Sequence, residues 1–139
     1  MFTFIKRYWP SILVFFSICW LTLAPEPVGE VHIELFAGAD KVVHACMMGG
    51  LTAVMLVDAW RIDCKIPTVK SIATIAFAIV IFSALDECAQ DAMAYGRTGE
   101  IGDFVADICG VVIALLASLP VLRVLERKNF PESDTSDDE

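Results

Sequence analysis

The chain has 139 residues, 57% of them hydrophobic, and its mean hydropathy is +0.66. These values exclude a soluble multidomain enzyme and indicate a small membrane protein that crosses the bilayer several times. The net charge of −8 identifies no partner, because five of the 18 acidic residues lie within the last eight positions of the chain. The basic residues are scattered and form no stripe, which excludes nucleic-acid binding.

Four uncharged stretches predict four membrane helices, over about residues 8–24, 40–60, 69–90 and 103–123. The first stretch could also be a signal peptide, but Pro25 directly follows the only suitable cleavage point, so we favour a helix. We therefore expect an all-α, four-helix membrane bundle over residues 1–128. Residues 129–139 are expected to form an acidic, disordered tail in the cytoplasm.

The predicted helices are long enough to cross the hydrocarbon core only if their polar ends are included. Only 15 uncharged residues separate Asp107 from Arg123, which is about 22 Å of helix against a hydrocarbon core of ~30 Å. Small residues recur every four positions in the second stretch and in the fourth stretch, at Ala45, Gly49 and Ala53 and at Gly102, Ala106, Gly110, Ala114 and Ser118. Such stripes allow close helix packing, within one chain or between copies, and they leave the oligomeric state open.

Polar residues occur at one end of three predicted helices. They lie at the start of the second helix (Asp40, Lys41 and His44), at the end of the third (Glu87 and Gln90) and at the start of the fourth (Asp103 and Asp107). Within each helix their spacing is i, i+3 or i, i+4, so they share a face. Because ionisable groups at membrane depth usually mark a site, we expect a shared polar pocket. The alternative interpretation is structural: Asp40 and Asp103 would cap their helices, and His44 would be a hydrogen-bonded interior histidine.

The remaining polar residues are interpreted as structural. Asp58 and Asp63 are expected to be surface charges near Arg61. The five cysteines lack disulfide or zinc spacing and indicate packing. Eight of the ten Lys and Arg residues lie on one side of the predicted topology, so both termini are expected in the cytoplasm and the polar pocket outside.

Three hypotheses fit the polar residues, and the sequence does not rank them. In the first, a divalent metal is coordinated by Asp103, Asp107, Glu87 and His44. In the second, the paired acids share a proton and perform acid/base chemistry, with the same four residues as catalytic candidates. In the third, Lys41 and Arg97 bind an anionic lipid or cell-wall precursor.

Over roughly residues 37–116 the chain resembles the VanZ-like family of small bacterial membrane proteins, in the ordered motifs Asp40-Lys41-x-x-His44, Glu87-x-x-Gln90, Arg97 and Asp103-x-x-x-Asp107-x-x-Gly110. Members typically carry Asn or Asp at the position of Asp107 and often glycine where Ala114 stands, so Ala114 departs from the pattern. The resemblance implies that the family's shared polar residues form the ligand site, namely Asp40, Lys41, His44, Glu87, Gln90, Arg97, Asp103 and Asp107.

The family is named for low-level teicoplanin resistance, so the resemblance implies a role in the cell envelope, in the bacterial cytoplasmic membrane. We expect a protein that binds, and could modify, an anionic lipid-linked or cell-wall component, with an effect on glycopeptide susceptibility. One alternative is a structural or interaction protein whose polar cluster only locks the helices. A second alternative is a metal-dependent membrane hydrolase, and the residues leave open whether any reaction is catalysed.

Overall fold

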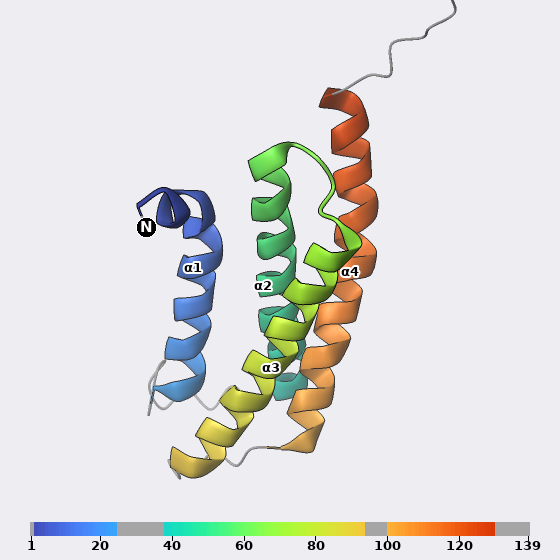
Figure 1. Ribbon diagram of the computed structural model, residues 1–139. Helices are drawn as coiled ribbons and strands as arrows, with labels where there is room; N and C mark the ends of the chain where they lie inside the picture. Colours follow the sequence, from blue (N-terminus) through green and yellow to red (C-terminus); the bar gives the residue numbers. More distant parts are fainter. Residues whose placement is uncertain (1, 25–37, 94–99, 130–139) are drawn as a thin grey trace, which may run out of the picture.

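The structure is a computed structural model, and it describes residues 2–24, 38–93 and 100–129 (Figure 1). Its described part is entirely helical, with α1 (Phe2–Leu23), α2 (Ala39–Asp63), α3 (Val69–Met93) and α4 (Ile101–Asn129). The expected all-α class is therefore confirmed. Arg97 and the predicted acidic tail lie outside the described residues.

Three of the described helices are long and apolar enough to cross a membrane, over Ala39–Ile62, Val69–Met93 and Ile101–Lys128. Helix α1 differs because its backbone is kinked at Tyr8, with φ −111° and ψ 18°. Pro10 explains the kink, since its ring cannot donate to the preceding turn and clashes with it. The part beyond the kink is only about 22 Å long at ~1.5 Å per residue. The four-span expectation is thus confirmed for α2, α3 and α4.

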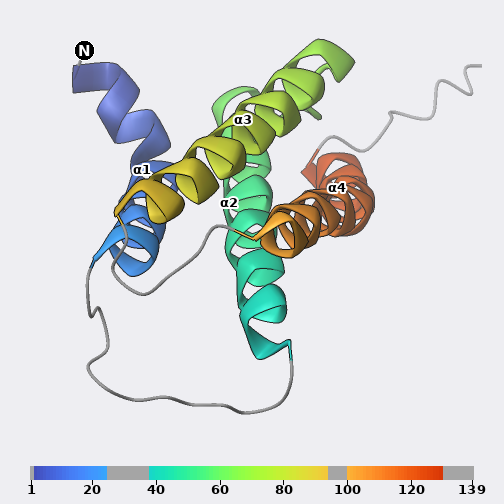
Figure 2. The ribbon, with the colours of Figure 1, turned by 90° about the horizontal axis from the view of Figure 1, so that it is seen from below.

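Helices α2 and α4 make the closest contact of the fold, and α2 also touches α1 and α3. A Cβ atom on Gly49 would lie 2.9 Å from the carbonyl oxygen of Gly110, and one on Gly110 would overlap the backbone of Ala45. The two small-residue stripes therefore do meet, as expected for close membrane packing. Helix α1 packs on the outside, against α2 and α3 but not α4 within the described residues (Figures 1 and 2).

The described helices expose apolar side chains and bury polar ones. Phe77 and Leu116 are 70% and 72% exposed, whereas Ser83 and Asp107 are each 1% exposed. A small apolar core does exist, at Ile18, Met48, Leu51, Ile79 and Val111. An apolar outer surface of this extent indicates contact with lipid, and polar groups inside such a bundle face one another.

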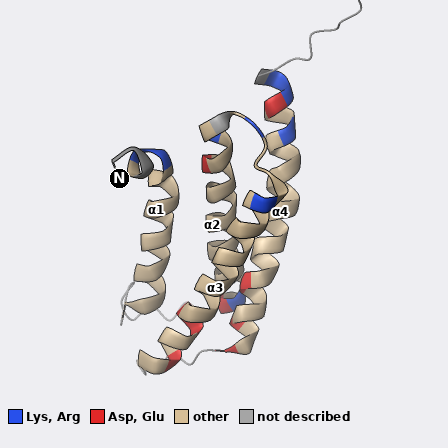
Figure 3. Cartoon of the chain, in the orientation of Figure 1, with Lys and Arg blue, Asp and Glu red and all other residues tan. Residues whose placement is uncertain are grey.

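Charge divides the molecule into two ends. Figure 3 shows Lys and Arg near the start of α1, between α2 and α3 and at the end of α4, while Asp and Glu dominate the opposite end. We call these the basic end and the acidic end. Asp58 lies toward the basic end, and the expectation of a surface charge there is wrong. Asp58 is 1% exposed, and its Oδ2 accepts hydrogen bonds from the Ser11 hydroxyl at 2.7 Å and the Ser11 backbone N–H at 3.1 Å.

Candidate functional site

The starts of α2 and α4 and the end of α3 lie together at the acidic end (Figure 1). Helix α2 begins after Gly38, whose φ of +86° is in the left-handed region that glycine tolerates. Helix α4 begins after Glu100, whose carbonyl oxygen accepts from the backbone N–H of Asp103 at 2.9 Å. The polar first turns of α2 and α4 thus lie beside the last turns of α3.

His44, Glu87 and Asp107 meet inside the bundle, one from each of α2, α3 and α4, and we call them the buried triad. The Nδ1 atom of His44 lies 3.5 Å from Oε1 of Glu87 and 3.4 Å from Oδ1 of Asp107. The side chain of Asp107 is 1% exposed, that of Glu87 11% and that of His44 13%. These three atoms have no hydrogen-bond partner within the described structure.

The other oxygen of each triad carboxylate does have a donor. The Ser83 hydroxyl donates to Oδ2 of Asp107 at 2.6 Å. The Glu100 backbone N–H donates to Oε2 of Glu87 at 3.2 Å. Each carboxylate is thus fixed by its outer oxygen, while its inner oxygen points toward His44.

Lys41 forms a second cluster about one helical turn closer to the end of the bundle, and we call it the lysine cluster. Its Nζ lies 3.2 Å from Asp40, 3.0 Å from Glu100 and 3.1 Å from Asp103. A Cβ on Gly102 would lie 2.8 Å from Cε of Lys41. Gly102 therefore leaves room for the lysine side chain to reach across from α2 to α4.

Gln90 belongs to a third group, apart from the buried triad. Its Nε2 donates to Oδ2 of Asp86 at 3.0 Å, and Oδ1 of Asp86 accepts from the Thr22 hydroxyl at 2.8 Å. All three side chains are buried. Asp86 and Gln90 are four residues apart on α3 and face α1, whereas the neighbouring Glu87 faces α2 and α4.

The predicted site residues are therefore divided among three places. Of the four proposed metal ligands, His44, Glu87 and Asp107 come together, and Asp103 instead pairs with Lys41. Asp40 is exposed and accepts from Lys41, and α2 has no side-chain cap. Three further polar residues of the site were not predicted from the sequence, namely Ser83, Asp86 and Glu100. The spacing of Ser83 from Glu87, four residues on one helix, was the available signal for the first of them.

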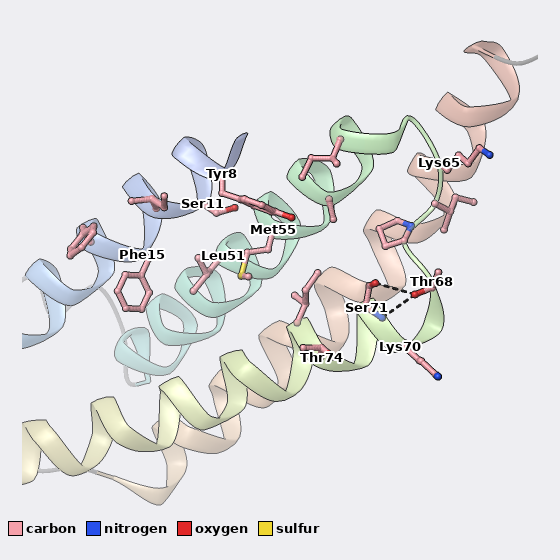
Figure 4. A pocket seen from close by; sticks show the side chains of 17 residues that line it. Tyr8, Ser11, Phe15, Leu51, Met55, Lys65, Thr68, Lys70, Ser71 and Thr74 are labelled. Atoms are coloured by element: carbon pink, nitrogen blue, oxygen red, sulfur yellow. Dashed lines mark hydrogen bonds between the residues drawn. The ribbon is translucent and has the colours of Figure 1, made fainter. Parts of the chain in front are cut away.

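A cavity of about 1100 Å³ lies away from these clusters, toward the basic end, between α1, α2 and α3 (Figure 4). Its wall includes the apolar side chains of Phe15, Leu51 and Met55, and Lys65 and Lys70 stand at its border. The Thr68 hydroxyl accepts the backbone N–H of Ser71 at 3.2 Å and so caps α3 beside the cavity. No pattern in the sequence predicted this cavity.

Comparison with known proteins identifies the family of the chain but no individual relative. A family model described as VanZ/LLP1 matches residues 1–123. No curated protein and no solved structure matches. The matched range contains α1, α2, α3 and both clusters of the acidic end.

Proposed function

The chain belongs to the VanZ/LLP1 family, and from this premise we propose that it binds a lipid-linked or cell-wall component carrying a phosphate or carboxylate group. The binding site is the acidic end of the bundle. The observation that carries the proposal is the gathering of buried polar groups from three lipid-exposed helices, since such groups inside a membrane protein usually serve a ligand or an ion.

The distribution of Lys and Arg supports an external position for this site. Basic residues cluster at the opposite end of the described helices (Figure 3), and cytoplasmic loops are enriched in Lys and Arg. Both termini then lie in the cytoplasm, and the polar groups face the outer leaflet of the cytoplasmic membrane. A ligand of the cell envelope is accessible from that side.

The charge of the two clusters restricts how an anion can bind. Asp40, Glu87, Glu100, Asp103 and Asp107 provide five carboxylates, and Lys41 provides one ammonium group. A phosphate approaching these carboxylates without further positive charge would be repelled. Recognition therefore depends on cations held among the acids, and among the described residues of the site Lys41 supplies the ammonium group.

Binding can be measured with a polyisoprenyl phosphate in nanodiscs, in comparison with the corresponding neutral alcohol. We expect Lys41→Gln and Asp107→Asn each to weaken binding of the phosphate at least about tenfold, which corresponds to ~1.4 kcal/mol. Lys65→Gln, at the basic end, is the matched control for Lys41 and should bind normally. Unchanged binding and unchanged teicoplanin response in cells carrying either acidic-end variant would refute the proposal.

A structural role is the second candidate, and one pattern favours it. Three buried aspartates each accept a hydroxyl hydrogen bond from another helix: Ser11 to Asp58, Thr22 to Asp86 and Ser83 to Asp107. Such contacts tie helices together without a ligand. Thermal unfolding in detergent separates the two roles, because Asp107→Asn should unfold the bundle if the contact is architectural and should only reduce binding if it is a site.

A further inference from the structure

Three buried atoms of the acidic end face one another without hydrogen-bond partners: Nδ1 of His44, Oε1 of Glu87 and Oδ1 of Asp107. Buried polar atoms are almost always paired, and a buried carboxylate without a compensating charge is costly. The Asp107 carboxylate is the strongest case, because it is 1% exposed. Something positively charged among these atoms would satisfy all three together.

The spacing of these atoms matches ligands around one metal ion better than a direct hydrogen bond. Nδ1 of His44 is 3.5 Å from Glu87 and 3.4 Å from Asp107, and the three ligand atoms lie within 4.8 Å of one another. Nitrogen–oxygen hydrogen bonds are about 2.7–3.2 Å long. Two ligands of a tetrahedral ion with bonds of about 2.0–2.1 Å lie about 3.3–3.4 Å apart.

We propose that the buried triad binds one divalent cation through His44 Nδ1, Glu87 Oε1 and Asp107 Oδ1. One imidazole nitrogen and two carboxylate oxygens in tetrahedral spacing suit a borderline ion such as Zn²⁺. Ca²⁺ is disfavoured because it takes six to eight oxygen ligands. Asp103 is not a ligand, since its carboxylate already faces the ammonium group of Lys41 at 3.1 Å.

The donors behind the triad have the arrangement that metal sites require. Ser83 holds the outer oxygen of Asp107 and the Glu100 backbone N–H holds the outer oxygen of Glu87. Such hydrogen bonds orient carboxylate ligands and typically change metal affinity by about 10–100-fold when removed. Ser83 is therefore a positioning residue, which acts on the metal through Asp107.

Three protein ligands leave a tetrahedral ion with one open position, which a water molecule or an anionic oxygen can occupy. The ion also brings positive charge to a group of carboxylates that would otherwise repel a phosphate. This role of the open position rests on the proposed function, whereas the metal site itself does not.

The test is a metal titration of the full chain in detergent after removal of divalent ions with a chelator. We expect calorimetry to show one Zn²⁺ per chain, and bound Co²⁺ to show the visible absorption of a four-coordinate site. His44→Gln, Glu87→Gln and Asp107→Asn should each weaken binding at least about 100-fold, beyond the effect of losing an orienting group. Asp86→Asn is the matched control, because Asp86 is buried beside Glu87 but both of its oxygens accept hydrogen bonds within the protein.

Wild-type protein that binds no metal in this titration would overturn the proposal, and this result needs no variant to fold. Equal binding by wild type and Asp107→Asn, with circular dichroism showing both to be helical, would overturn it too, because the ions would then lie on other acidic groups. Metal binding without polyisoprenyl phosphate binding would leave the metal site standing and refute the proposed function. The converse result would refute the metal site and retain the function.

Discussion

The buried triad and the lysine cluster are built from similar parts at neighbouring levels of the same helices. In each, a nitrogen from α2 faces carboxylates of other elements. In the lysine cluster the side chains of Asp40 and Glu100 are 56% and 55% exposed, and the cation is the protein's own ammonium group. In the buried triad Asp107 is 1% exposed, and its inner oxygen has no partner within the described residues.

The comparison shows that the exposed cluster carries the protein's own ammonium group, whereas the buried triad is where we propose a bound divalent ion. Near the end of the bundle a long lysine side chain can cross from α2 to α4 over Gly102 and keep part of its surface in water. One turn deeper, the corresponding α2 position is the shorter His44, and no ammonium group reaches the described triad. At that depth the carboxylates face the His44 imidazole, which is a cation only when protonated, and the divalent ion proposed above would neutralise them.

The largest expected effect comes from separating α2 and α4, on which both clusters depend. In Gly110→Ala the new Cβ would overlap the carbonyl group of Ala45, so the helices must move apart. We expect a loss of about 3 kcal/mol in the free energy of unfolding. The control is Gly50→Ala, which meets no atom within 4 Å and should be neutral or stabilising. Thermal unfolding in detergent measures both, and equal stability would show that α2 and α4 are not closely packed.

The next largest effect is the stabilisation of the protein by bound metal, which should depend on the buried triad and not on the lysine cluster. At a Zn²⁺ concentration of 100 times Kd, binding should raise the free energy of unfolding by about 2.7 kcal/mol. Asp107→Asn, which should bind at least about 100-fold more weakly, should retain no more than about 0.4 kcal/mol of this gain. Asp103→Asn, in the lysine cluster, should keep all of it. Unfolding curves with and without chelator provide the measurement. A gain lost in Asp103→Asn and kept in Asp107→Asn would reverse the assignment of the clusters.

A smaller effect is expected from the donor behind Asp107. Ser83→Ala removes the hydroxyl that holds Oδ2 of Asp107, so metal affinity should fall about 10–100-fold while the stoichiometry stays the same. Ser71→Ala, an exposed serine at the start of α3, should bind metal as the wild type does. Calorimetric titration measures the metal affinity of both variants. Identical affinities would exclude a positioning role for Ser83.

The smallest effect is expected in the lysine cluster. Lys41→Gln removes the ammonium group from among Asp40, Glu100 and Asp103. Asp40 and Glu100 are more than half exposed, so losing their ion pairs should cost little stability because water screens them, and the main cost falls on the buried Asp103. The three carboxylates should acquire weak affinity for a divalent ion such as Ca²⁺, detectable as a second binding event in calorimetry. Absence of this event would indicate that the carboxylates spread apart once the lysine is gone.

Hydropathy and small-residue spacing predicted much of the fold. They identified helices over most of α2, α3 and α4, and the stripes containing Gly49 and Gly110 do face each other. Helical spacing also selected His44 and Asp107, because both lie one turn inside the polar ends of their helices. These features depend on local periodicity, which a single sequence contains.

The parts that could not be predicted depend on which helix lies opposite each residue. Asp58 is buried because Ser11 of α1, 47 positions away in sequence, hydrogen-bonds to it. Glu87 and Gln90 belong to different groups because α3 presents one face to α1 and another to α2 and α4. Glu100 lies outside the helical pattern, and its role follows from the path of the chain into α4.

The outer position of α1 affects how firmly that helix is held. Lipid tails are as apolar as leucine side chains, so apolar contact alone gives little reason for α1 to prefer protein over bilayer, and interhelical hydrogen bonds in membranes contribute on the order of 1 kcal/mol each. Its attachment then relies heavily on Ser11, midway along α1, and Thr22, near its end, which bond to Asp58 and Asp86, and on Arg7, which donates to the Ile62 carbonyl oxygen. We therefore expect α1 to detach before the other described helices, leaving α2, α3 and α4 with both clusters.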